Sequence, residues 1–172
     1  MENNQQSFVY SPEVVEFMTV AVQTCLFLEQ QVDEETRETL IQKLIRLLPV
    51  LYVKTLLLPV SDNQNDGFLE QFCTEEQYET VRYALAERLG DDDMYLALPL
   101  EEGRYGDIAQ TRSISEDIAD IYQALKDMAH NYQLHDEEVM EEAIMECVDA
   151  FKEHWGLKLL DALHALHVIQ TV

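Results

Sequence analysis

Apolar side chains recur every three or four residues along most of this chain, and this helical spacing constrains the fold more than any other feature. The first such segment begins at Ser11, Pro12 and Glu13, residue types that favour the start of a helix. Comparable segments follow over residues 33–48, 51–58, 75–89, 113–132, 136–155 and 157–169. The sequence therefore predicts a single all-α domain over residues 1–172, a bundle of about six to seven helices, with any disorder at residues 1–10.

Capping residues mark where several of these helices begin. Thr74 with Gln77, and Ser113 with Glu116, have the spacing of a capping box, in which each side chain bonds the backbone N–H of the other residue. Asp136 is expected to cap the helix that follows. These signals fix three helix starts before any packing is considered.

Other residues predict breaks. Asp33 is expected to cap a helix that Pro49 kinks or ends, which leaves 51–58 as a separate helical piece. Gly90 is expected to end the third long helix, and Gly156 to end or kink the helix that precedes it.

Two connections lack helical spacing. Residues 61–72 are rich in Asp, Asn and Gly and predict a long loop. Residues 91–112 predict an extended connection, in which 94–100 has the composition of one short strand. Because one short strand has no evident pairing partner, no sheet is predicted.

The chain is strongly acidic, with 34 acidic residues against 11 basic ones and a formal charge of −23. This balance disfavours nucleic acid and anionic membrane surfaces, both of which need Lys and Arg on their partner. The acid is unevenly spread, with eight acidic and four basic residues over 1–60 but thirteen and three over 113–172. We expect the C-terminal half to meet a cation or a basic protein surface.

The cysteines and the N-terminus predict the compartment. Cys25, Cys73 and Cys147 are odd in number and far apart, which is typical of a reducing environment. The N-terminus has no basic region followed by an apolar core, and the apolar runs are too short to span a bilayer. We therefore expect a cytoplasmic protein that makes no membrane contact.

One face of the helix over 136–155 is acidic. Its apolar side is defined by Met140, Ile144, Cys147 and Phe151, and the opposite side carries Glu138, Glu142, Glu146, Asp149 and Glu153. Like charges four residues apart destabilise an isolated helix by a few tenths of a kcal/mol each. The stripe is either a solvated surface or a contact for a cation or basic partner.

Two histidines are expected to face inward. His154 lies close in helical angle to Met140 and Cys147, and His167 lies between Leu160 and Leu163 on the last helix. His164 is expected to point outward. Inward imidazoles serve either as core groups hydrogen-bonded to a carbonyl or carboxylate, or as ligands.

The helix over 113–132 carries two carboxylates, Asp117 and Asp120, which are about 60° apart around the helix axis. Asp117 lies beside the apolar face, and Asp120 lies beyond the first turn, where Asp is a poor helix former. Both are either surface acids or members of a site with Glu146 and with His154 or His167. Such a site would supply carboxylate and imidazole ligands for a divalent metal, or an acid–base pair.

The segments SEDIADIYQALK and HWGLKLLDALHALH resemble an uncharacterised bacterial family catalogued as domain of unknown function 5063. The resemblance covers 113–167 well and implies an all-helical fold, with no established activity. The matching positions are Asp117, Asp120, Tyr122, Glu146, His154, Trp155, Gly156 and His167. Lys158 replaces the second His of the family's His-Trp-Gly-x-His segment, so a metal ligand at that position would be lost here.

A weaker resemblance is to all-α nucleoside triphosphate pyrophosphohydrolases, which bind magnesium through a Glu-Glu-x-x-Glu helix followed by Glu-x-x-Asp. Glu34, Glu35 and Glu38 resemble the first element, and EDIAD resembles the second. Asp117 stands where the family has Glu, and the gap between the two elements is far longer than in the family.

Two functional hypotheses follow. The first is a non-enzymatic acidic helical module that binds a basic protein partner and needs no cofactor. The alternative is a hydrolase of a small phosphorylated or anionic substrate, dependent on Mg²⁺ or another divalent metal. In that hypothesis Asp117, Asp120, Glu146 and His154 would hold the metal, with His167 as acid–base group or support. The candidate polar cluster common to both is Asp117, Asp120, Tyr122, Glu146, His154 and His167.

Overall fold

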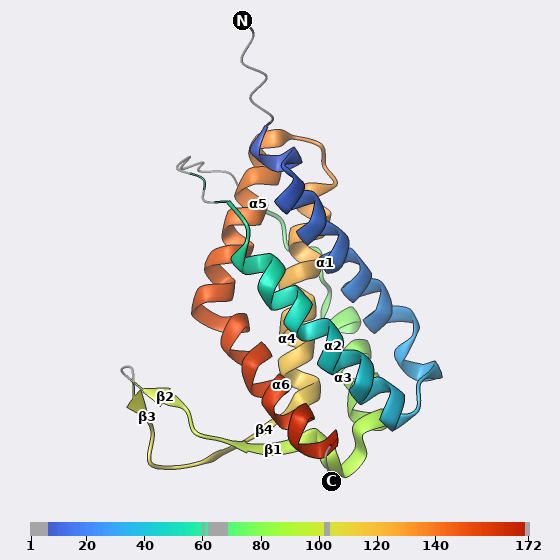
Figure 1. Ribbon diagram of the computed structural model, residues 1–172. Coiled ribbons are helices and arrows are strands. Elements are labelled where there is room, and N and C mark those ends of the chain that lie inside the picture. The colour runs from blue at the N-terminus through green and yellow to red at the C-terminus, as the bar shows by residue number, and fades with distance from the viewer. Residues whose placement is uncertain (1–6, 60, 62–68, 102–103, 171–172) are drawn as a thin grey trace, which may run out of the picture.

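The computed structural model describes residues 7–59, 61, 69–101 and 104–170. Figure 1 shows its helices packed side by side into an elongated bundle. The described α-helices are α1 (Pro12–Gln30), α2 (Arg37–Leu56), α3 (Glu75–Leu89), α4 (Ile114–Tyr132), α5 (Glu137–Ala150) and α6 (Gly156–Gln170). The predicted all-α, single-domain class is confirmed.

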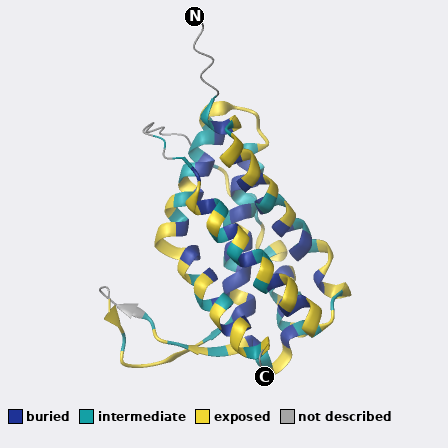
Figure 2. Cartoon of the chain, in the orientation of Figure 1, coloured by how far each residue is buried: buried dark blue, intermediate teal, exposed yellow. Residues whose placement is uncertain are grey.

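Helix α4 lies at the centre of the bundle and packs against α1, α3, α5 and α6. Its apolar stripe includes Ile114, Ile118, Ile121 and Leu125, all of which are at most 1% exposed. Burying a side chain of this size contributes roughly 1.5–3 kcal/mol. Figure 2 shows the same pattern across the bundle, with buried residues on the inward faces of the helices. The helical spacing in the sequence therefore locates the core correctly.

The predicted caps at three helix starts are present. Thr74 and Gln77 form the complete capping box of α3. Ser113 Oγ accepts a hydrogen bond from the Glu116 N–H at 3.3 Å at the start of α4, which is one half of the capping box predicted there. Asp136 accepts from two N–H groups in the first turn of α5.

The prediction that Asp33 caps the second helix is wrong. Val32–Glu34 forms a short 3₁₀ turn, and α2 begins at Arg37 with Thr36 as its cap. The Thr36 side chain accepts from the Thr39 N–H, and the Thr39 side chain accepts from the Thr36 N–H. This capping box has Thr at its third position instead of the usual Glu or Gln, so the usual sequence signature does not reveal it.

Pro49 neither ends nor splits α2, contrary to the prediction of a separate helical piece over 51–58. The helix continues through Pro49 to Leu56. Proline inside a helix costs about 3 kcal/mol because it removes a backbone donor and crowds the preceding turn. Leu44, Leu48 and Leu51 are each at most 1% exposed on the inner face, and their burial offsets that cost.

The connection over 91–112 is a β-ribbon, which corrects the prediction of one unpaired strand. β1 (Met94–Ala97) pairs antiparallel with β4 (Gln110–Ser113), and beyond them β2 (Leu100–Glu101) pairs with β3 (Arg104–Tyr105). The ribbon projects from the end of the bundle where α4 begins (Figure 1). The polar sequence of β4 lacks the apolar alternation by which strands are recognised.

A π-helical turn over Phe151–Trp155 joins α5 to α6, so of the two predicted outcomes at Gly156, an end or a kink of the helix, the end does not occur. The Gly156 N–H donates to the carbonyl oxygen of Phe151, five residues earlier. A Cβ at Gly156 would lie 2.4 Å from that oxygen, so only glycine fits. The buried Trp155 donates its indole N–H to the Cys147 carbonyl at 3.1 Å.

The chain near its N-terminus is ordered where it is described. Phe8–Tyr10 forms a 3₁₀ turn, and the buried Val9 accepts a hydrogen bond from the Tyr132 hydroxyl at 2.7 Å. Residues 1–6, for which disorder was also predicted, lie outside the described residues. Most of the loop predicted over 61–72 also lies outside them. Among the described helices, none is both long and apolar enough to cross a membrane.

Candidate functional site

Asp117 is buried, at 2% exposed, and is held by two partners. It pairs with the guanidinium of Arg112 and accepts a hydrogen bond from the hydroxyl of Tyr95. Arg112 also pairs with Asp161 of α6 at 2.8 Å. Burial raises the pKa of Asp117, and Tyr95 and Arg112 oppose that rise. The group ties the base of the β-ribbon to α4 and α6.

Asp120, one turn further along α4, has a separate set of partners. It accepts a hydrogen bond from the Tyr78 hydroxyl of α3 at 2.8 Å and pairs with the ammonium of Lys158 of α6. Burial and the bond to Asp120 raise the pKa of Tyr78. A protonated phenol and an ammonium therefore satisfy this carboxylate from two helices.

Tyr122 is fully buried and points toward α1. Its hydroxyl donates to Glu29 at 2.7 Å, and Lys126 pairs with the same carboxylate. Burial and Glu29 raise the pKa of the Tyr122 phenol. Tyr122 therefore connects α4 to α1, and its hydroxyl bonds neither Asp117 nor Asp120.

The expectation that His154 and His167 face inward is wrong. The His154 side chain is 73% exposed, because the π turn holds one more residue than an α turn and rotates Trp155 into the core instead. On α6 the inner face is formed by Leu159, Ala162 and Leu166, so the next residue, His167, is exposed. His167 Nδ1 lies 3.0 Å from Gln170 Nε2. His164 is exposed, as predicted.

The candidate cluster is thus divided among different contacts. Asp117 and Asp120 lie on adjacent turns with their own cations, while Glu146 is exposed on α5. Among the residues that the structure describes, no group of three or more His, Cys, Asp or Glu side chains could hold a metal ion. A functional role for the cluster stays a prediction.

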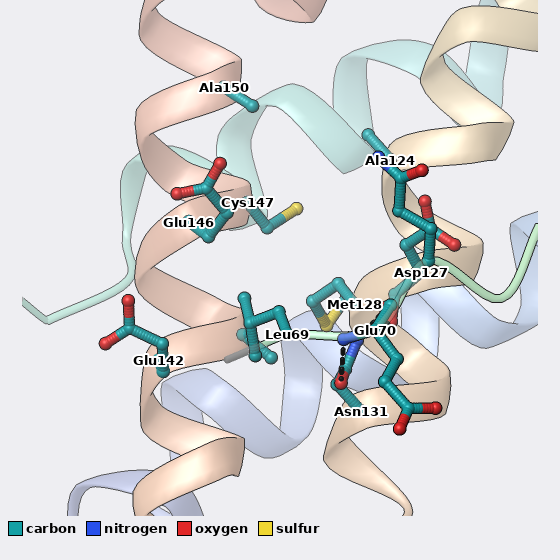
Figure 3. Close-up of a pocket in the computed structure, with 12 residues that line it drawn as sticks. Leu69, Glu70, Ala124, Asp127, Met128, Asn131, Glu142, Glu146, Cys147 and Ala150 are labelled. Atoms are coloured by element: carbon teal, nitrogen blue, oxygen red, sulfur yellow. Dashed lines mark hydrogen bonds between the residues drawn. The ribbon is translucent and has the colours of Figure 1, made fainter. Parts of the chain in front are cut away.

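A cavity of about 350 Å³ lies between α4, α5 and residues 69–71. Figure 3 shows Glu142 and Glu146 on its α5 side, Asp127 and Glu70 on the opposite side, and apolar side chains between them. The lining residues are Leu69, Glu70, Gln71, Ala124, Asp127, Met128, Asn131, Glu142, Ala143, Glu146, Cys147 and Ala150. Of these, the sequence pointed to Glu142 and Glu146 only.

Two residues of α4 hold the chain that closes this cavity. Asp127 Oδ1 accepts from the backbone N–H groups of Phe72 and Cys73, each at 2.7 Å. The buried Asn131 donates to the Glu70 carbonyl at 2.9 Å and accepts from the Glu70 N–H. The partners of Asp127 and Asn131 are backbone groups, which any residue type supplies. The sequence therefore signals this contact only by an Asp and an Asn four residues apart on one helix.

Asp93 is a buried carboxylate that the sequence analysis missed. It is 6% exposed and accepts from both the N–H and the hydroxyl of Ser115, each at 2.7 Å. It therefore supplies a second cap for α4 from the preceding connection. The run Asp91–Asp93 has the composition of a solvated turn, which hides the role of its last residue.

The fold and the polar contacts define a helical bundle protein with a projecting β-ribbon, whose inward carboxylates hold neighbouring elements together. The chain belongs to the family described as a domain of unknown function (DUF5063), whose model matches residues 8–171. It is similar to the crystal structure of protein BF1032 from Bacteroides fragilis, with 35% identity and a TM-score of 0.82. That match covers 95% of this chain and 96% of the other. No curated protein matches the chain.

Proposed function

We propose that this protein is a non-enzymatic interaction module that binds a basic protein surface through its acidic C-terminal half. The supporting observation is the engagement of every basic residue of that half. Lys126 pairs with Glu29, Lys152 with Asp149 and Lys158 with Asp120. All three lysines of residues 113–172 are therefore paired, two of them with acidic residues of the same segment, which carries thirteen acidic residues in all.

The acidic stripe of α5 carries this charge to the surface. Glu138, Glu146 and Asp149 are exposed along this helix, and Glu153 is exposed in the π turn that follows it. No ion pair joins Glu138 or Glu146 to another residue in the described part of the chain. A surface with one dominant sign of charge accelerates encounter with an oppositely charged partner and repels partners of its own sign.

The contacts of the inward carboxylates also favour a non-enzymatic role. Asp117 bonds Arg112 and Tyr95, and Asp120 bonds Lys158 and Tyr78. Through these bonds the two carboxylates of α4 hold neighbouring helices and strands together. The metal-dependent hydrolase is less well supported, since its expected ligands Asp117 and Asp120 are paired with cations while His154 and Glu146 point to solvent.

The test is capture of partner proteins from a bacterial lysate by the immobilised chain at rising salt. We expect retained proteins to be basic and to elute between low salt and about 0.5 M salt, because screening weakens contacts between exposed charges. The variant Glu138→Gln/Asp149→Gln/Glu153→Gln should retain less.

The matched control neutralises three exposed acids elsewhere, Glu34→Gln/Glu76→Gln/Glu87→Gln, and should retain as much as the wild type. Retention that is insensitive to salt, equal loss in the two triple variants, or capture of no protein would contradict the proposal.

A further inference from the structure

We propose that this protein forms a dimer with two-fold symmetry through its β-ribbon, in which each copy covers the exposed apolar side chains of the other. The inference goes beyond the proposed function and does not rest on it, since no residue that it uses belongs to the acidic stripe of α5. Three features of the ribbon support it: exposed apolar residues, uncovered outer strands and a low net charge.

The ribbon carries large apolar side chains that are exposed to water. They are Met94, Leu96, Leu98, Tyr105 and Ile108, each between 50% and 78% exposed. Exposed apolar residues scattered singly are ordinary on a protein surface, whereas a concentration of them marks a contact surface. The ribbon holds five of them along one narrow projection.

Strand β1 has apolar residues on both of its faces. Tyr95 alternates with Met94 and Leu96, and successive side chains of a strand point to opposite faces. The Tyr95 hydroxyl bonds Asp117, so the face that carries Tyr95 meets the bundle. The opposite face leaves Met94 and Leu96 in water. A continuous apolar run such as that over 94–100 is typical of a strand covered on both faces.

The outer strands of the ribbon lie away from the bundle. β2 and β3 pair with each other, and Figure 1 shows them beyond the helices. A two-stranded ribbon by itself is marginally stable in water, and it gains stability when further strands or another surface pack on it. A partner on the ribbon would supply this cover.

The charge of the ribbon favours a second copy as that partner. Residues 94–113 hold three acidic and two basic residues, a balance of −1 in a chain whose formal charge is −23. Two copies repel each other wherever their acidic surfaces approach, and they repel least at the ribbon. A basic protein would instead be drawn to the acidic helices, and an acidic one would be repelled by the rest of the chain.

Two free charges on the ribbon are self-complementary. Arg104 and Asp107 are both exposed, and neither forms an ion pair with any other residue that the structure describes. In a contact with two-fold symmetry, each residue of a pair meets its opposite number from the other copy, so the pair forms twice. Arg104 of each copy would then pair with Asp107 of the other.

The test is the mass of the whole protein in solution as its concentration rises, measured by sedimentation equilibrium. We expect a rise from 20.0 kDa toward twice that mass and no further. Leu96→Lys/Ile108→Lys should raise the dissociation constant about tenfold or more, because it places unpaired charge in the contact. The matched control Val53→Lys/Leu56→Lys, which changes two exposed apolar residues of α2, should leave it unchanged.

Charge reversal tests the pairing within the contact. Arg104→Asp and Asp107→Arg should each weaken association about threefold to tenfold, because like charges then meet. An equimolar mixture of the two variants should associate as tightly as the wild type, since the reversed charges are opposite across the contact.

The mass of a single chain at millimolar concentration would overturn the inference and leave the ribbon to a different protein. Growth beyond two chains, or a dimer that Leu96→Lys/Ile108→Lys leaves intact, would overturn the two-fold contact at the ribbon. A mixture that associates no more tightly than its separate variants would do the same.

Discussion

Lys158 of α6 pairs with Asp120 of α4, and both residues lie in the segments by which the sequence resembles the family. In that resemblance, position 158 corresponds to the second His of a His-Trp-Gly-x-His segment. The pair shows that the position faces a carboxylate of α4, together with the Tyr78 hydroxyl of α3. A cation here balances Asp120, and histidine would do the same only when protonated.

Lys158→His should therefore give the protein a new pH dependence. A protonated imidazole beside Asp120 has a folded pKa above its unfolded value of roughly 6.5. Its stabilising contribution is then present below that value and is lost as the pH rises through the folded pKa. Urea unfolding at pH 5.5 and pH 8 should show the variant losing stability relative to the wild type as pH rises. Lys158→Arg, the control, should show no such change.

Gly156→Ala should destabilise the protein by about 1–3 kcal/mol, because the added methyl group would overlap the Phe151 carbonyl at 2.4 Å. Gly90→Ala provides a comparison at a position with open space but a φ of +57°. We expect it to cost about 1–3 kcal/mol, from a backbone with φ of +57° and ψ of −129° that residues with a Cβ rarely adopt. Chemical denaturation measures both costs, and an unchanged stability of Gly156→Ala would contradict the steric explanation.

The π turn also shows where sequence patterns stop being informative. Helical spacing correctly placed Met140, Ile144, Cys147 and Phe151 in the core, up to the turn. Beyond it the inserted residue changes the phase, so Trp155 is buried where His154 was expected. A periodicity argument assumes a constant rotation per residue, and no local composition signals this change.

Polar contacts over long sequence distances were likewise hidden. The pairing of Asp127 with the backbone of Phe72 and Cys73 spans more than fifty residues and involves no partner side chain. The pairing of Arg112 with Asp117 and Asp161 depends on the position of the β-ribbon, which the sequence did not predict. Helix positions and caps depend on neighbours in the chain and were largely predictable, whereas the partners of each carboxylate depend on the tertiary fold.

The thiols should differ in reactivity in a defined order. Burial raises the pKa of Cys25 and Cys147 to about 12 each, and that of Cys73 to about 11. Since the thiolate is the reactive form, all three should react slowly at pH 7. Cys73, the least buried, should react first with a disulfide reagent, and the other two only on unfolding. Mass mapping of the modified thiol checks this, and early labelling of Cys147 would contradict it.

The stability contributed by Asp117 should fall as pH rises. Burial raises its folded pKa above the unfolded value of roughly 3.9. The folded state therefore binds this proton more tightly, and the contribution is fully present below the unfolded pKa and lost as pH rises through the folded one. The difference in unfolding free energy between wild type and Asp117→Asn should thus shrink from pH 3.5 to pH 7. A difference that grows over this range would mean that pairing with Arg112 outweighs burial.

Arg112→Met isolates that pairing. It leaves the buried carboxylate of Asp117 without its guanidinium, so that the Tyr95 hydroxyl is its remaining hydrogen-bond partner among the described side chains. Because Arg112 is 27% exposed at its side chain, we expect a loss of about 2–3 kcal/mol, below the range for a fully buried pair. Adding Asp117→Asn should restore part of this stability, since the double variant no longer buries an uncompensated charge. Urea denaturation of the four proteins at pH 7 gives the coupling energy, and additive losses would show that the two residues stabilise the fold independently.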